Sequence, residues 1–214
     1  MTTPAPSAPL RRHARSNRAR ILAVARRELG SSPDTTLDEI AIAAGVARRT
    51  LYGHFPGREA LLEALAEEAE QALRDALEDG PALDGRPEYA LAQLVLRLWG
   101  VGDRYRMLIS VARRDLGVER VEKLLEPARH AVTAVLARGQ EEGTFHRLLP
   151  VDALNAGLEA LSMALLERLD PEEFQDLPGA VAMQSLVAAG VPALAAQEVV
   201  GEVRREAPGA PPGA

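Results

Sequence analysis

Apolar side chains recur at steps of three and four residues along nearly the whole sequence. This spacing places them on one face of an α-helix, whereas a half-buried β-strand would alternate apolar and polar residues. Ala, Leu, Glu and Arg, which have high helix propensities, dominate the same segments. No segment shows sustained strand-like alternation. The sequence therefore predicts an all-α protein.

The basic and acidic residues are distributed unevenly along the chain. Residues 1–60 hold ten Arg and five acidic residues, which gives this part a net charge of +5. The rest of the chain holds 15 basic and 26 acidic residues, a net charge of −11. The formal charge of −6 thus hides a basic N-terminal part. A polyanion such as DNA is attracted by the first part and repelled by the second.

Several classes of protein are excluded or disfavoured by what the sequence lacks. The absence of cysteine excludes disulfides, thiolate metal sites and cysteine nucleophiles. The four histidines lack metal-ligand spacing, and no HExxH, P-loop or GxSxG motif occurs. No apolar run reaches the ~18 residues of a membrane span, and the Pro- and Ala-rich N-terminus does not resemble a signal peptide. We expect a cytoplasmic protein that is not an enzyme and uses neither cofactor nor metal.

The N-terminal part predicts a helix-turn-helix. Helices are expected over residues 16–29, 37–44, 48–54 and 58–79. Thr36 and Glu39 have the spacing of a capping box, which marks the start of the second helix. Gly45 supplies the left-handed conformation of a tight turn before the third helix. Two short helices joined in this way usually place the second one in the major groove of DNA.

The C-terminal part predicts further helices after a Gly- and Pro-rich linker near residue 80. They are expected over residues 87–99, 103–113, 119–142, 152–169 and 179–205. The Gly-Val-Gly run at 100–102 is expected to end the first of them. Pro127 is expected to kink or split the third, and the Gly-Val-Pro run at 190–192 to break the last.

The residues around the predicted turn carry a more specific signal. The run TLDEIAIAAGVARRTLYGHF at 36–55, followed by PGREAL to residue 61, resembles the DNA-binding domain of TetR-family bacterial transcriptional regulators. Arg20, Ile21, Leu22 and Ala25 resemble the first helix of that family. The resemblance covers residues 13–73 and implies a long fourth helix that leads to a C-terminal helical domain for ligand binding and dimerisation.

The resemblance and the composition together divide the chain into four parts. Residues 1–12 are expected to form a disordered basic arm, and residues 13–73 the DNA-binding domain with its helix-turn-helix at 36–55. Residues 74–206 are expected to form the effector-binding and dimerisation domain. Residues 207–214, which are rich in Pro, Gly and Ala, are expected to be a disordered tail.

Hydrogen-bond donors are concentrated in the third helix. Within about two turns it holds Arg48, Arg49, Thr50, Tyr52 and His54. An arginine can bind guanine O6 and N7 with two hydrogen bonds, and tyrosine and histidine can donate to phosphate oxygens. The resemblance assigns Arg48, Arg49 and Gly53 to the side that faces the bases. It assigns Thr36, Tyr52, His54 and Arg58 mainly to phosphate.

One position departs from the family pattern in a way that affects stability. Ala47 stands where the family usually has Ser or Thr, so the third helix lacks a capping side chain worth about 1 kcal/mol.

The resemblance also implies partners for the C-terminal part. The helices over about 152–169 and 179–205 are expected to form a four-helix bundle with a second copy of the chain. A homodimer would present two reading helices to palindromic half-sites ~34–36 Å apart. Candidate effector-binding residues are the bulky or adaptable side chains Trp99, Tyr105, Met107 and Met163.

The sequence analysis thus predicts a DNA-binding transcriptional regulator of the TetR type. It is expected to be a homodimeric repressor that an unknown small molecule releases from a palindromic operator. The alternatives are an all-helical adaptor, a small-molecule-binding protein or an enzyme that no longer binds DNA.

Overall fold

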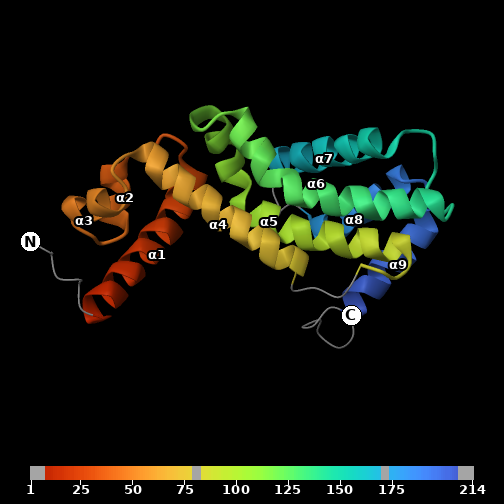
Figure 1. The fold of residues 1–214 in the computed structure, drawn as a ribbon, viewed down its shortest axis with the longest axis horizontal. Coiled ribbons are helices and arrows are strands. Elements are labelled where there is room, and N and C mark those ends of the chain that lie inside the picture. The colour runs from red at the N-terminus through yellow and green to blue at the C-terminus, as the bar shows by residue number, and fades with distance from the viewer. Residues whose placement is uncertain (1–7, 79–82, 170–173, 207–214) are drawn as a thin grey trace, which may run out of the picture. The chain divides into compact units, whose positions relative to one another are not determined.

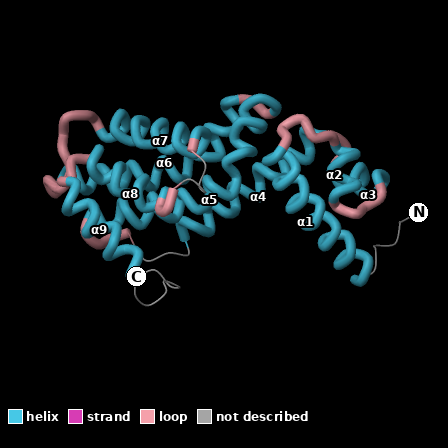
Figure 2. Tube along the Cα trace, turned by 180° about the vertical axis from the view of Figure 1, so that it is seen from behind, coloured by secondary structure: helices cyan, strands magenta, loops and turns pink. Residues whose placement is uncertain are grey.

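The computed structural model describes residues 8–78, 83–169 and 174–206, without the side chains of residues 8–15 and of Met107. These residues form helices and connecting loops, and no strand occurs among them (Figures 1 and 2). The elements are α1 (Ala8–Ser31), α2 (Leu37–Ala43), α3 (Arg48–His54), α4 (Arg58–Glu78), α5 (Pro87–Asp115), α6 (Val118–Glu141), α7 (Val151–Arg168), α8 (Leu177–Ala188) and α9 (Ala193–Glu206). The prediction of an all-α fold is confirmed.

The helices are grouped into two compact units. The first consists of Met1–Glu70 and Tyr105–Leu124, and the second of Gln71–Arg104 and Leu125–Ala214. Along α4 the chain passes from the first unit to the second after Glu70, whereas the expected domain boundary follows residue 73. The sequence analysis did not predict that residues 105–124 pack with the N-terminal helices.

The first unit is built around the apolar faces of its short helices. Ile21, Ala25 and Leu29 of α1 are fully buried, as the helical spacing predicts. Ile40 of α2 and Leu51 of α3 are buried as well, and α1, α2 and α3 pack on one another (Figure 1). This small core holds α3 by one side only.

The local signals of the helix-turn-helix are confirmed. Thr36 caps α2 in a capping box with Glu39, and Gly45 takes a positive φ of 62° in the turn after α2. Ala47 precedes α3 without a side-chain capping bond. These features depend on residues only a few positions apart, which is why the sequence locates α2 and α3 closely.

The first helix is longer than expected. α1 begins at Ala8 rather than Ser16, so residues 8–12 of the expected arm are helical. Pro9 lies in the first turn, where proline does not remove a needed intrahelical donor. Residues 1–7 of the arm, the linker residues 79–82 and the expected tail at 207–214 lie outside the described residues.

The second unit corrects one predicted helix end and narrows another prediction. α5 continues through the Gly-Val-Gly run at 100–102, and Pro127, expected to kink or split its helix, lies inside α6 without splitting it. A β-carbon at position 102 would lie 2.9 Å from a methyl carbon of Leu166, so glycine here permits close packing of α7 on α5. An internal glycine costs only about 1 kcal/mol, which tertiary packing easily offsets.

The expected break at residues 190–192 is confirmed. The chain breaks between α8 and α9 at Gly190, whose φ is 105°. The core is apolar, with Leu91, Leu94 and Leu136 fully buried, and Leu158 and Leu186 packed against them. Apolar side chains also remain on the surface of this unit, among them Leu161 of α7 and Val187 of α8.

Candidate nucleic-acid interface

The start of α2 is fixed by reciprocal hydrogen bonds. The backbone N–H of Thr36 and its hydroxyl both donate to Oε2 of Glu39, each at 2.8 Å, and the N–H of Glu39 donates to Oγ1 of Thr36 at 3.3 Å. The backbone N–H of Thr36, with help from its hydroxyl, lowers the pKa of Glu39. The Thr36 hydroxyl proton is therefore used within the cap, which leaves its oxygen lone pairs as the more accessible group.

The expected reading face of α3 lies on the surface. Leu51 of α3, and Phe55 directly after the helix, are buried in the core. Arg48, Arg49 and Gly53 are exposed. Tyr52 is 44% exposed and does not pack into the core. Thr50 and His54 are half-buried, and the ring of His54 lies against that of Phe55 with centroids 6.2 Å apart. The side of α3 that carries the predicted base contacts is thus open.

The two arginines of α3 differ in their partners. Nη2 of Arg48 lies 3.1 Å from Oδ2 of Asp38 on α2, although 67% of the Arg48 side chain is exposed. For Arg49, no ion pair or hydrogen bond occurs within the described part of the chain. Arg48 is held by a carboxylate before any ligand arrives, whereas Arg49 extends from the surface.

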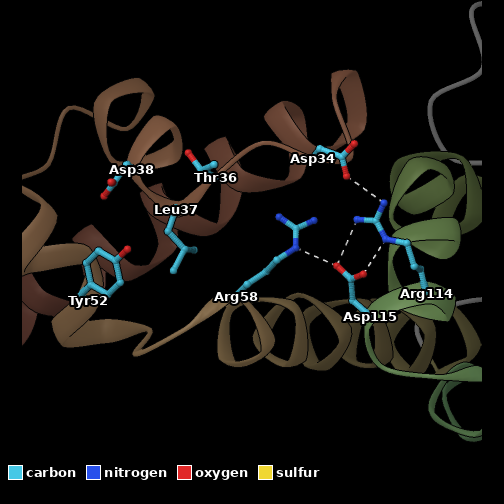
Figure 3. Close-up of a pocket in the computed structure, with 8 residues that line it drawn as sticks. All are labelled: Asp34, Thr36, Leu37, Asp38, Tyr52, Arg58, Arg114 and Asp115. Atoms are coloured by element: carbon cyan, nitrogen blue, oxygen red, sulfur yellow. Dashed lines mark hydrogen bonds and ion pairs between the residues drawn. The ribbon is translucent and has the colours of Figure 1, made fainter.

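Arg58 occupies a different place from the one the sequence predicts. Its guanidinium donates to three acceptors within the first unit: Oδ2 of Asp115 at 2.8 Å, the carbonyl of Thr35 at 2.7 Å and the carbonyl of Pro33 at 2.5 Å. Figure 3 shows the side chain reaching from the start of α4 towards the end of α5. Arg58 is therefore bound to the loop before α2 and to α5, rather than extended from the surface.

Arg114 and Asp115 are part of this arrangement and were missed by the sequence analysis. Nε of Arg114 donates to Oδ1 of Asp115 at 2.7 Å, and Nη1 donates to Oδ1 of Asp34 at 3.0 Å. Hydrogen bonds from Arg114 and Arg58 hold the pKa of Asp115 below its usual range. The only hint in the sequence is an Arg-Arg-Asp run at a helix end, because the partner Arg58 lies 57 residues away.

A hollow of about 430 Å³ lies beside these groups. Its lining comes from the loop before α2, from α2, α3, α4 and the end of α5: Asp34, Thr36, Leu37, Asp38, Tyr52, Arg58, Arg114 and Asp115 (Figure 3). Thr36 and Tyr52, both expected at phosphate, lie on the same hollow. Arg58 and Asp115, joined by their hydrogen bond, line another part of it. The structure thus brings the expected phosphate contacts next to an internal ion-pair network.

The expected effector residues have different surroundings. Trp99 is buried and Met163 half-buried in the second unit, and the side chain of Met107 lies outside the described residues. Tyr105 belongs to the first unit, where its hydroxyl donates to Glu68 at 3.1 Å and the guanidinium carbon of Arg26 lies 5.4 Å from its ring centroid. Burial, together with Glu68, raises the pKa of Tyr105. Tyr105 thus supports the junction of α1, α4 and α5.

The described residues contain no group of three or more metal-ligating side chains, and none of their helices is long and apolar enough to cross a membrane.

Comparison with known proteins supports the interpretation of the N-terminal domain. Residues 21–65 match the family of bacterial regulatory proteins called the tetR family. No curated protein matches the chain.

Solved structures of similar fold cover most of the chain. A bacterial regulatory protein in the tetR family from Rhodococcus RHA1 is 19% identical, with a TM-score of 0.70 over 82% of this chain and 98% of that one. The TetR-family regulator PfmR from Thermus thermophilus is 19% identical, with a TM-score of 0.68 over 80% and 98%. LfrR, a TetR-like regulator from Mycobacterium smegmatis, is 23% identical, with a TM-score of 0.62 over 82% and 97%. Residues 21–65 thus match the tetR family, and the helices of the chain are arranged as in these regulators.

Proposed function

We propose that this protein is a sequence-specific DNA-binding regulator that acts in the cytoplasm as a homodimeric, ligand-responsive repressor. The observation that carries the proposal is the one-sided burial of α3. Leu51 anchors the helix in the core, while Arg48 and Arg49 stand on the open side with Tyr52. Two guanidinium groups on an exposed face of a helix-turn-helix have the geometry and charge needed to reach guanine edges in the major groove. The proposal includes no enzymatic activity.

The roles of individual residues follow from their exposure. Arg48 and Arg49 contact bases, and Gly53 lets the helix approach the groove closely. Thr50, Tyr52 and His54 contact the phosphate backbone. Thr36 is left out of this group because its backbone N–H and its hydroxyl both donate to Glu39. Arg58 is removed from this second group because its guanidinium is bound within the protein.

The dimer is proposed to form through α7 and the α8–α9 segment. Small or apolar residues make up an exposed strip on α7: Ala153, Ala156, Gly157, Ala160 and Leu161. On α8, Val187 is 43% exposed, although the helix is apolar around almost its whole circumference. A helix that is apolar on all sides is usually buried, and a second copy of the same surface would bury it. This interface brings two copies of α3 to one palindromic operator.

The effector is proposed to bind in the second unit, where Trp99 and Met163 are the candidate contacts that lie within that unit. Related folds carry chemically different ligands: LfrR was solved with proflavine, and FadR from Bacillus subtilis with stearoyl-CoA. We therefore propose a small-molecule effector without assigning its class. Its binding and DNA binding must weaken each other by the same factor.

Selection of operator DNA from a random pool tests the proposal directly. The full-length protein should enrich a palindromic sequence and retard it, with affinity that falls steeply as salt concentration rises. Sedimentation should show a dimer without DNA. An adaptor or an enzyme would enrich no sequence, and a monomer at micromolar concentration would contradict the proposed interface.

A further inference from the structure

We propose that Asp115 is a positioning residue for operator recognition. It lies at the end of α5, outside the helix-turn-helix, and acts through Arg58 on the loop that leads into α2. The inference rests on the proposed DNA-binding function and adds to it a group that never touches DNA.

The guanidinium of Arg58 holds the backbone of the loop before α2. Arg58 donates to the carbonyls of Pro33 and Thr35, the residues immediately before the Thr36 cap. Thr35 itself is buried, and its hydroxyl donates to the carbonyl of Ser32 at 2.7 Å. Any shift of Arg58 therefore changes where α2 begins. Because α2 packs on α3, the position of the reading helix depends on this loop.

Asp115 determines where the Arg58 guanidinium lies. The Arg58 and Asp115 side chains are only 31% and 20% exposed, and Nε of Arg58 lies 2.8 Å from Oδ2 of Asp115. The other carboxylate oxygen, Oδ1, accepts from Arg114, which also reaches Asp34 in the same loop. Figure 3 shows the four side chains as a continuous series from Asp34 through Arg114 and Asp115 to Arg58. The loop is thus tied to α5 at both Asp34 and Thr35.

Net charge alone and a positioning role for Asp115 predict opposite changes in DNA affinity when Asp115 is neutralised, which makes the inference testable. Asp115 is an anion within a DNA-binding unit, so its neutralisation should strengthen DNA binding if it has no other role. If it positions Arg58, its neutralisation leaves a half-buried guanidinium without its counter-charge and frees the loop. Specific binding then weakens, while contacts to random DNA, which need no exact geometry, are retained.

The experiment compares full-length wild type with Asp115→Asn, Arg58→Gln and the double variant. Glu119→Gln is the matched control. It also removes one negative charge from the Tyr105–Leu124 part of the first unit, and Glu119 is exposed on α6. Affinities for the selected operator and for random DNA are measured over a range of salt concentrations. Thermal melting establishes the folded fraction of each variant.

We expect a distinct result from each of these variants and from Asp115→Glu. Asp115→Asn weakens operator binding about tenfold, a free-energy change of about 1.4 kcal/mol, without weakening binding to random DNA. Arg58→Gln has a similar effect with an unchanged salt slope, and the double variant is no weaker than the worse single variant. Asp115→Glu, which keeps the charge, restores part of the operator affinity, whereas Glu119→Gln leaves the ratio of the two affinities unchanged.

Other results overturn the inference. If Asp115→Asn strengthens operator binding as Glu119→Gln does, Asp115 acts only as a charge. If Arg58→Gln lowers the salt slope by about 0.9, Arg58 contacts a phosphate instead. If Asp115→Asn does not fold, Arg114→Gln decides: a lower ratio of operator to random affinity supports the inference, and an unchanged ratio overturns it. A wild type that selects no operator contradicts the proposed function itself, which separates the two failures.

Discussion

The arginines of α3 and those at the junction of α4 with α5 and α6 belong to the same unit but have different surroundings. Arg49 is exposed and has no ion pair or hydrogen bond in the described part of the chain. Arg58 and Arg120 are largely covered and bind two or more acceptors each. The arginines of this unit thus fall into two groups. Some are exposed and open to a ligand, and others connect the helices of the unit.

Removal of an α3 arginine should have the largest effect. Arg49→Ala is expected to cost about 1–3 kcal/mol of operator binding and far less on random DNA, because a two-hydrogen-bond contact with guanine is lost. Fluorescence anisotropy with labelled operator and random duplexes measures both values. Equal losses on the two duplexes would assign Arg49 to phosphate and weaken the contrast with Arg58.

Removal of a junction arginine should change stability instead. Arg120 donates to Glu63 at 3.0 Å and to Glu70 at 2.6 Å. Although burial opposes its charged form, the two carboxylates raise the pKa of Arg120. Arg120→Gln should lower the free energy of unfolding by about 1 kcal/mol, since Glu63 is partly exposed and screened by solvent.

Chemical denaturation measures this loss, with Arg104→Gln as the control because Arg104 is exposed on α5. The ratio of operator to random affinity should stay at the wild-type value. A changed ratio with unchanged stability would place Arg120 among the arginines that serve DNA binding.

Arg48 is an intermediate case, because it is exposed like Arg49 but paired with Asp38. Asp38→Asn removes that partner and also a negative charge near the proposed DNA surface. Binding to random DNA should strengthen slightly, while discrimination at the base read by Arg48 should fall by up to about fivefold, the size of an exposed ion pair. Competition with operators substituted at single positions measures this change. Unaltered discrimination would show that Asp38 does not orient Arg48.

The sequence predicted the features that depend on neighbouring residues. The capping box at Thr36, the turn at Gly45 and the helix over 48–54 are each determined within a few positions, so local physical chemistry locates them. The apolar face of α1 followed from its spacing for the same reason. The matched family covers this part of the chain.

The features that the sequence analysis missed depend on distant residues. The Gly-Val-Gly run at 100–102 does not end α5, and Gly102 lies close against Leu166, a residue 64 positions away. Arg58 was assigned to phosphate by the resemblance, and its partner Asp115, 57 residues away, left no local signal of their hydrogen bond. A local pattern gives the type of a side chain and its place on a helix. It does not indicate which groups from elsewhere in the chain surround it.

The smallest expected effect is the pH dependence of the stability that Asp115 contributes, and acid titration measures it. Arg114 and Arg58 lower the pKa of Asp115 in the folded protein, so its contribution to stability is complete above the unfolded value of ~3.9. As the pH falls below that value and through the folded pKa, the contribution is lost. The unfolding free energy of Asp115→Asn should therefore decrease less than that of wild type between about pH 5 and 2.5. Glu119→Gln keeps Asp115, so it should keep the part of this decrease that comes from Asp115. If the unfolding free energies of wild type and Asp115→Asn fall equally with pH, the carboxylate is not held by the two arginines in solution. The distinction between the arginines of α3 and those of the junction would then rest on exposure alone.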